Sequence, residues 1–144
     1  MDSMRITLEA DYAVRIVQCL ADYGARLGAG SIAERTGVSL RFALKILRRL
    51  ASAGVVRSFK GAGGGYILAK RAEDITLREV IETIEGPIVI SRCQCEDYVC
   101  DHPDDYACYY QKIFEEAAQM IREKFDKVNF GQKPRPTAYE KVPE

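Results

Sequence analysis

Two helices separated by a glycine turn are predicted early in the chain, and this pattern restricts the fold more than any other feature of the sequence. Ser31 is the expected N-cap of the first helix and Gly37 its expected end, because serine accepts from free helix amides and glycine adopts left-handed backbone angles. Ser39 is the expected N-cap of a second helix over residues 40–53. Such a pair, joined by about three or four residues that include glycine, is typical of a helix-turn-helix.

A glycine-rich hairpin is predicted directly after these two helices. Residues 55–59 and 66–69 are rich in β-prone side chains, and four glycines lie in the connection from Lys60 to Gly65. Glycine tolerates the positive φ angles of a tight connection. The hairpin therefore corresponds to the wing of a winged helix, and apolar periodicity predicts further helices over residues 8–23 and 76–85.

The 144 residues are expected to form one small domain with an appendage. A cysteine-rich segment without periodicity precedes a long amphipathic helix and a tail that contains three prolines. We expect a mainly α fold with a small β-wing (α+β). Its parts are a winged helix-turn-helix over 4–86, a cysteine-rich loop over 87–108, a dimerisation helix over 109–128 and a flexible tail over 129–144.

Charge is separated along the chain although it sums to zero. Residues 31–71 contain nine basic residues and one acid, a net charge of +8, whereas residues 93–108 contain five acids and no Lys or Arg. Basic residues concentrated on a helix-turn-helix and its wing favour a polyanionic partner. Double-stranded DNA is the expected partner.

Four cysteines lie within sixteen residues, namely Cys93, Cys95, Cys100 and Cys108. The sequence contains no apolar run of the roughly 20 residues that a membrane span needs, and its N-terminus has no signal pattern. We therefore expect a cytoplasmic protein without membrane association. In a reducing compartment, clustered cysteines are more often metal ligands or redox-active thiols than disulfides.

The residues alone leave three interpretations of these cysteines open. Thiolates bind both zinc and iron–sulfur clusters, and spacing does not choose between them. Zinc sites commonly use C-x2-C or C-x4-C pairs, and Cys95 with Cys100 forms only one such pair. The third interpretation is unliganded or redox-active thiols. Nearby acids raise the pKa of such thiols, which argues against a catalytic cysteine.

Base contacts are expected from the start of the second helix of the motif. A recognition helix places its N-terminal residues at base edges in the major groove. The candidates are Ser39, Leu40, Arg41 and Lys45. Arg41 is the candidate for specificity, because arginine can bond guanine through two hydrogen bonds.

Contacts with the DNA backbone are expected from residues around the base contacts. Arg48 and Arg57 are candidates for phosphate neutralisation, and Lys60 with Gly61 would bring the wing backbone to phosphates or into the minor groove. The glycines match neither the G-x-G-x-x-G pattern nor a P-loop, so no nucleotide ligand is expected.

The order of these features resembles the IscR, NsrR and RirA type of bacterial transcription regulator. Shared features are the start Met4-Arg5-Ile6-Thr7, the following Asp11-Tyr12-Ala13, the helix-turn-helix, the Gly63-Gly64-Gly65-Tyr66 wing and the cysteine loop. The resemblance covers nearly all of residues 4–128. It implies a homodimer with a winged helix, a long dimerisation helix and, in many members, an iron–sulfur cluster held by three cysteines before that helix.

The chain departs from this family by having four cysteines, spaced C-x-C-x4-C-x7-C. The resemblance implies Cys100 and Cys108 as ligands of a [4Fe-4S] or [2Fe-2S] cluster, with Cys93 slightly preferred to Cys95 as the third. Two residues are candidates for a fourth ligand. His102 is the only histidine in the sequence, and Asp11 matches a position from which nitric-oxide-sensing relatives supply a carboxylate across the dimer.

We therefore expect a dimeric DNA-binding regulator that binds a palindromic operator and senses iron, redox state or nitric oxide through the cluster. One alternative is a cluster-free winged-helix regulator that responds to a metabolite or a partner protein. A less favoured alternative is an electron-carrying iron–sulfur protein. The sequence offers no paired carboxylates and no Ser/His/Asp set for acid–base chemistry, so an enzyme is not expected.

Overall fold

The computed structural model describes residues 4–101, 103 and 106–132, except for the side chains of residues 106–108. Within these residues the chain forms five α-helices, a two-stranded hairpin and two single 3-10 turns. The helices are α1 (Leu8–Tyr23), α2 (Ala29–Thr36), α3 (Leu40–Ser52), α4 (Leu77–Glu85) and α5 (Tyr106–Asp126), the strands are β1 (Val56–Phe59) and β2 (Gly65–Leu68), and the turns are η1 (Ala72–Asp74) and η2 (Arg92–Gln94).

Helix caps confirm most of the predicted helix starts. The Ser39 side chain accepts from the amide of Phe42 at the start of α3, and Thr7 and Thr76 cap α1 and α4 in the same way. The predicted cap of α2 was wrong, because α2 begins at Ala29 and Ser31 lies inside it. The preceding Leu27 pairs with Tyr66 of the hairpin, and this long-range contact fixes where the helix starts.

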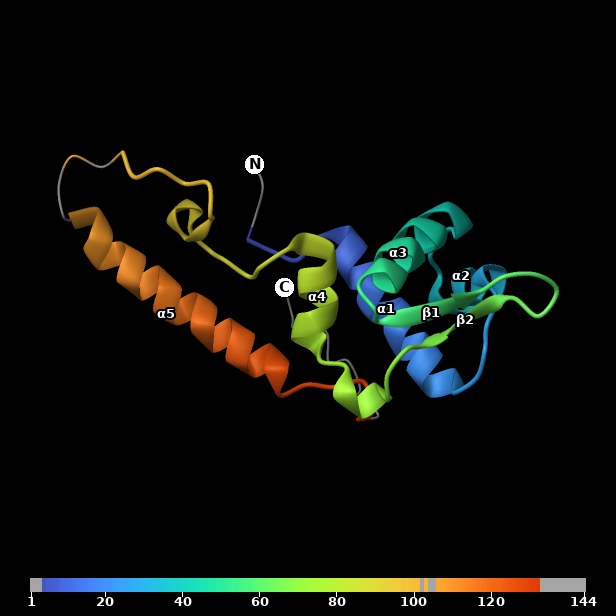
Figure 1. Cartoon of the computed structure of the whole chain (residues 1–144). Helices are drawn as coiled ribbons and strands as arrows, with labels where there is room; N and C mark the ends of the chain where they lie inside the picture. Colours follow the sequence, from blue (N-terminus) through green and yellow to red (C-terminus); the bar gives the residue numbers. More distant parts are fainter. Residues whose placement is uncertain (1–3, 102, 104–105, 133–144) are drawn as a thin grey trace, which may run out of the picture.

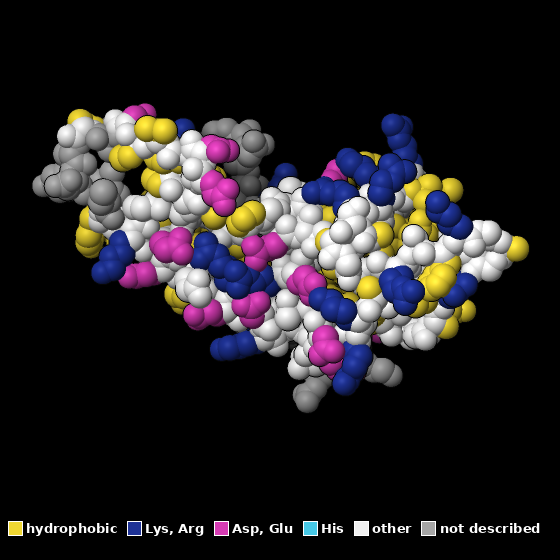
Figure 2. Space-filling view, viewed as in Figure 1, with side chains coloured by type: hydrophobic (Ala, Val, Ile, Leu, Met, Phe, Trp, Pro, Cys, Tyr) yellow, Lys and Arg dark blue, Asp and Glu magenta, His cyan; other side chains and the backbone are white. Residues whose placement is uncertain are grey.

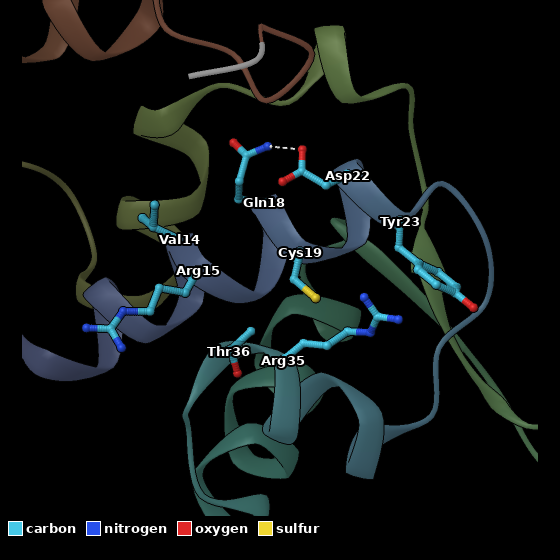
Figure 3. Close-up of a pocket in the computed structure, with 8 residues that line it drawn as sticks. All are labelled: Val14, Arg15, Gln18, Cys19, Asp22, Tyr23, Arg35 and Thr36. Atoms are coloured by element: carbon cyan, nitrogen blue, oxygen red, sulfur yellow. Dashed lines mark hydrogen bonds between the residues drawn. The ribbon is translucent and has the colours of Figure 1, made fainter. Parts of the chain in front are cut away.

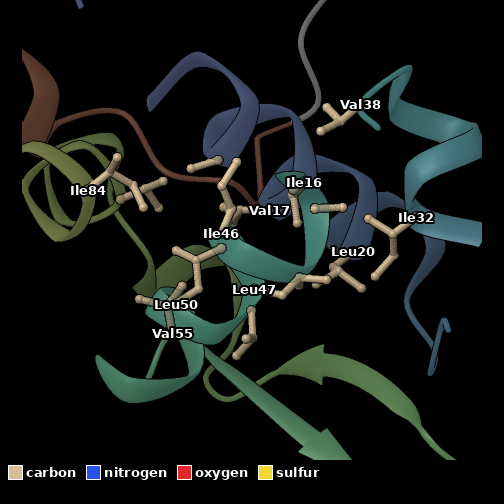
Figure 4. Close-up of a cluster of buried hydrophobic side chains, with 14 of the residues drawn as sticks. Ile16, Val17, Leu20, Ile32, Val38, Ile46, Leu47, Leu50, Val55 and Ile84 are labelled. Atoms are coloured by element: carbon tan, nitrogen blue, oxygen red, sulfur yellow. The ribbon is translucent and has the colours of Figure 1, made fainter. Parts of the chain in front are cut away.

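A single apolar core joins the first four helices to the hairpin (Figure 4). Ile16, Val17 and Leu20 from α1 meet Ile46, Leu47 and Leu50 from α3, and all six side chains are buried. Burial of an aliphatic side chain of this size contributes about 1.5–3 kcal/mol. The core therefore holds α3 rigidly against α1.

The hairpin is the predicted wing. Strands β1 and β2 are antiparallel, with Val56 opposite Leu68 and Phe59 opposite Gly65. Figure 1 shows the connection between the strands projecting away from the helices. The mainly α fold with a β-wing is thus confirmed.

Helix α5 extends away from the winged helix as an arm, and the cysteine-rich segment leads to its outer end (Figure 1). The helix begins at Tyr106, three residues before its predicted start, so Cys108 belongs to the helix and not to the loop. No helix in the described part of the chain is long and apolar enough to cross a bilayer.

The segment predicted as a flexible tail starts with residues that pack against the winged helix. Phe130 is buried, its amide lies 3.2 Å from the carbonyl oxygen of Ala72, and Asn129 pairs with Thr76. An apolar ring that reaches the core outweighs the polar composition of its neighbours. Residues 133–144 of the predicted tail lie outside the described residues.

Candidate functional site

The start of α3 is exposed, as contact with base edges requires. Leu40 is 50% exposed, and the side chains of Ser39 and Arg41 are also exposed. Basic side chains gather over α3 and the hairpin on the face shown in Figure 2, whereas acidic side chains gather mainly over the part of the molecule that contains α5. The basic cluster in the sequence therefore lies over the winged helix.

Lys45 is held by an acid from another helix. Its Nζ lies 2.8 Å from a carboxylate oxygen of Glu9 in α1, and Arg49 Nη1 lies 3.3 Å from the other oxygen. The hydrogen bond from Lys45 lowers the pKa of Glu9. Lys45 would have to share its charge between this carboxylate and DNA.

The two adjacent arginines of α3 have different surroundings. Arg48 is exposed, whereas Arg49 is half-buried and donates from Nη2 to the carbonyl oxygen of Ile84 at 2.5 Å, near the end of α4. Sequence reasoning missed Arg49 and Glu9. Arg49 bonds Ile84, 35 residues away, and Glu9 bonds Lys45, 36 residues away. A local sequence pattern does not indicate contacts over such separations.

Glycine is required at two positions of the wing for different reasons. Gly65 has a φ of 142°, and a Cβ there would lie 2.6 Å from the carbonyl oxygen of Leu27. Gly64 has no positive φ, but a Cβ there would lie 2.7 Å from the carbonyl oxygen of Gly61. The connection is therefore closely folded, and it presents Lys60 and Gly61 to solvent.

The cysteine-rich segment contains the short turn η2, which begins at a capping box formed by Ser91 and Gln94. Cys93 in this turn is half-buried, and its sulfur lies 3.5 Å from the Ser91 hydroxyl oxygen. Cys93 also lines a cavity of about 290 Å³ between η2 and α5, together with Tyr98 and Phe114. Cys95 and Cys100 are exposed.

Three hydrogen bonds connect this segment to α5. Arg122 Nε donates to the carbonyl oxygen of Ile88 at 2.9 Å, and the Ser91 hydroxyl bonds the Gln111 amide oxygen at 2.9 Å. The Gln94 amide donates to Glu115. A hydrogen bond from Arg122 also lowers the pKa of Glu115. Both ends of residues 88–94 are thus attached to the long helix.

The predicted metal ligands are not gathered into one site within the described residues. No group of three or more potential His, Cys, Asp or Glu ligands is found there. His102 lies outside the described residues, as does the side chain of Cys108. Asp11 forms an ion pair of 2.9 Å with Arg15 in α1. Burial and a hydrogen bond to Asp101 raise the pKa of Tyr98, which lies in the same segment.

A separate open cavity of about 700 Å³ lies between α1 and α2 (Figure 3). Cys19 and Arg35 line it, and burial raises the pKa of the Cys19 thiol. The Cys19 side chain is half-buried and packs against the core cluster.

An exposed recognition helix, a glycine-built wing and a basic surface over both define a winged-helix DNA-binding protein. The family model described as Rrf2, iron-dependent transcriptional regulator, matches residues 6–132. The chain belongs to this family of transcriptional regulators, and it is not an enzyme.

Curated relatives support this assignment over different shares of the chain. Protein rrf2 of Nitratidesulfovibrio vulgaris is 32% identical over 125 residues, which cover 85% of this chain and 82% of the relative. An rrf2-like HTH-type regulator of Rhodobacter capsulatus is 37% identical over 77% of this chain and 79% of its own length. IscR of Escherichia coli is 36% identical over 63% of this chain, and the match spans 57% of IscR.

Solved structures agree with the fold. A transcriptional regulator from Listeria innocua has a TM-score of 0.76 at 26% identity, covering 100% of this chain and 96% of its own. IscR of T. potens has a TM-score of 0.68 at 25% identity, covering 89% and 84%. CymR, the global cysteine regulator of B. subtilis, has a TM-score of 0.72 at 23% identity, covering 89% and 94%, and shows the shared fold.

Proposed function

We propose that this regulator acts as a homodimer on a palindromic operator and senses iron, redox state or nitric oxide through an iron–sulfur cluster in its cysteine-rich segment. One observation carries the proposal. The segment that contains the cysteines leaves the end of α4, and Arg49 of the recognition helix is bonded to the same end of α4. A change in the segment can therefore reach α3 through the bond from Arg49 to the carbonyl oxygen of Ile84.

The DNA-contact residues of this proposal are those at the exposed start of α3 and along the wing. Arg41 contacts base edges, with Ser39 and Leu40 beside it. Arg48, Arg57 and the wing residues Lys60 and Gly61 contact the backbone. Lys45 contacts DNA while it also pairs with Glu9, whose carboxylate lies 2.8 Å from the Lys45 Nζ.

The cysteines fit an iron–sulfur cluster by the chemistry of their donors. Thiolate is the usual ligand of [4Fe-4S] and [2Fe-2S] clusters, and Cys93, Cys95 and Cys100 are free thiols on a segment that leads into the helix containing Cys108. Cys93 is favoured over Cys95, because it lines the cavity beside α5 whereas Cys95 is exposed. Asp11 and His102 remain the candidates for a fourth ligand, and zinc bound by the same thiolates is the alternative.

Dimerisation through α5 is supported by the apolar side chains that this helix leaves exposed. Tyr109 is 65% exposed, Ile113 43% and Met120 71%, and these three residues share one face of the helix. Ala118 on the opposite face is buried, and Ile121 at the edge between the two faces is half-buried. An apolar face of this kind is typical of an interface, and a two-fold pair of arms would place two recognition helices on two half-sites.

The cluster is tested by anaerobic purification and by measurement of iron and sulfide in wild type and in Cys93→Ala, Cys95→Ala, Cys100→Ala and Cys108→Ala. We expect iron and sulfide in wild type and in Cys95→Ala, and their loss in the other three. Cys19→Ala is the matched control, because Cys19 lies in α1 outside the segment. Zinc without sulfide would support the zinc alternative, and a colourless protein without metal would favour a cluster-free regulator.

Sensing is tested by measuring the affinity of reconstituted and apo protein for a duplex that the wild type selects from a random pool. Coupling between sites commonly changes affinity by a factor of about 5 to 150. Equal affinity of the two forms would show that the cluster is not the switch. If no duplex is selected over random DNA, the proposal that the protein binds a specific operator is rejected.

A further inference from the structure

We infer that Arg26, in the loop between α1 and α2, is the residue that positions the wing for DNA contact. The inference rests on the proposed contact between the wing and DNA. Arg26 was not among the candidate residues in the sequence, because it lies outside both the helix-turn-helix and the hairpin.

Arg26 contacts the wing at two places at once. Its Nη1 donates to the carbonyl oxygen of Gly63 at the tip of the hairpin, and its guanidinium lies 3.7 Å from the centre of the Phe59 ring at the end of β1. A planar guanidinium can stack and donate together, which an ammonium group cannot do. Arg26 thus joins the tip of the hairpin to the adjacent end of β1.

The residue next to Arg26 is itself part of the sheet. The amide of Leu27 donates to the carbonyl oxygen of Tyr66 at 3.1 Å, and the amide of Tyr66 donates back at 2.7 Å. Arg26 is therefore anchored where it leaves the backbone. A two-stranded hairpin alone is only marginally stable. A side chain whose own backbone is fixed, such as that of Arg26, can therefore decide how the tip of the hairpin is oriented.

The geometry of the tip matters because its cations are exposed. Lys60 lies at the start of the tip, and Arg57 lies 5.5 Å from the same Phe59 ring. Phosphate contacts need a cation at a fixed distance from the recognition helix. Loss of Arg26 would leave these cations in place but would let the tip move.

The test uses the full chain, a duplex of about 30 base pairs selected by the wild type, and a cycle of Arg26→Ala, Lys60→Ala and the double variant. We expect Arg26→Ala to weaken binding about three- to tenfold, the range that a hydrogen bond with a cation–π contact allows. The double variant should bind about as weakly as Lys60→Ala, because Arg26 acts through the tip. Arg26→Lys should behave like Arg26→Ala.

Retained affinity in Arg26→Lys would mean that Arg26 contacts phosphate directly and would overturn the inference. The same conclusion would follow if the losses of Arg26→Ala and Lys60→Ala were additive in the double variant and its salt slope were smaller by about one more. Unchanged affinity in Arg26→Ala would overturn it as well.

Hydrogen exchange of residues 61–66 in DNA-free protein separates this inference from the proposed DNA contact. Exchange should become faster in Arg26→Ala and Arg26→Lys and should stay unchanged in the matched control Arg57→Ala, which shares the ring but is not the residue bonded to the tip. Exchange unchanged in all three variants would reject the positioning role. Faster exchange together with full DNA affinity in Lys60→Ala would instead reject the wing contact of the proposed function.

Discussion

Glu9 of α1 holds Lys45 of the recognition helix at 2.8 Å, across 36 residues of sequence. The same carboxylate reaches Arg49 at 3.3 Å, so one acid joins the first helix to two cations of α3. The contact fixes the recognition helix on the side that faces away from its buried leucines. Protonation of Glu9 in acid would remove this ion pair.

Glu9→Gln should lower stability at neutral pH and should do so less in acid. Because the hydrogen bond from Lys45 lowers the pKa of Glu9 below its usual value, the ionised pair stabilises the fold above that usual pKa, and this stabilisation is lost as the pH falls through the lower folded pKa. Exposed pairs contribute at most about 1 kcal/mol, so the melting temperature should change by a few degrees at most. Thermal unfolding between pH 7 and pH 3 measures the difference in melting temperature between Glu9→Gln and wild type. Glu34→Gln, a substitution of an exposed acid, is the control. A difference from wild type that is as large at pH 3 as at pH 7 would contradict the assignment.

Arg41→Ala should reduce discrimination between the selected duplex and random DNA. A bidentate contact with guanine is worth about 1 to 3 kcal/mol, and its loss leaves nonspecific binding almost unchanged. Arg48→Ala is the matched comparison and should weaken both kinds of binding about equally, with a salt slope smaller by about one. The opposite pattern in competition binding would show that the recognition face is placed wrongly.

Gly65→Ala should destabilise the winged helix by about 1 to 3 kcal/mol, because alanine would be strained at a φ of 142° and its Cβ would meet the backbone of Leu27. Gly63→Ala is the control, since the nearest atom to a Cβ there is Arg26 Nη1 at 3.6 Å. Chemical denaturation of both variants measures the difference. Equal stability would mean that the tip does not keep this geometry in solution.

The sequence was sufficient where local chemistry decides the structure. The Ser39 cap, the glycine hairpin and the apolar stripes of α1 and α4 all predict their elements to within a residue or so. It was insufficient where a distant contact decides. The start of α2 depends on Leu27 pairing with Tyr66, and the anchoring of the tail depends on Phe130 reaching η1.

The long helix shows the same limit within one element. Its periodicity predicts an apolar side but does not say which apolar residues contact the chain itself. Ile121 lines a groove with Ile81 and Ile88, whereas Ile113 remains exposed, although the sequence places both on the same side. A pair of substitutions at Ile113 and Ile121 would therefore disturb the monomer as well as the dimer.

Ile113→Asp with Met120→Asp should produce a monomer that keeps its fold. Both side chains lie on the exposed apolar face of α5, so two carboxylates there would oppose pairing of the arms. Lys112→Ala with Gln119→Asp is a matched control, because these exposed residues have the same spacing and the substitutions change the net charge equally. Light scattering measures the mass, and circular dichroism checks the fold. A folded dimer of the Ile113 and Met120 variant would exclude this face as the interface.

Arg49→Gln should reduce the difference in DNA affinity between the reconstituted and apo forms. Arg49 bonds α3 to the carbonyl oxygen of Ile84, two residues before the chain leaves α4 toward the cysteines, so its loss breaks the contact through which α4 can move the recognition helix. Arg48→Gln removes the same charge from the neighbouring exposed position. Both variants should bind DNA more weakly than wild type, but only Arg49→Gln should bring the ratio of the two affinities toward one. An unchanged ratio in Arg49→Gln would show that the signal reaches α3 by another route, such as a change in the spacing of the two arms.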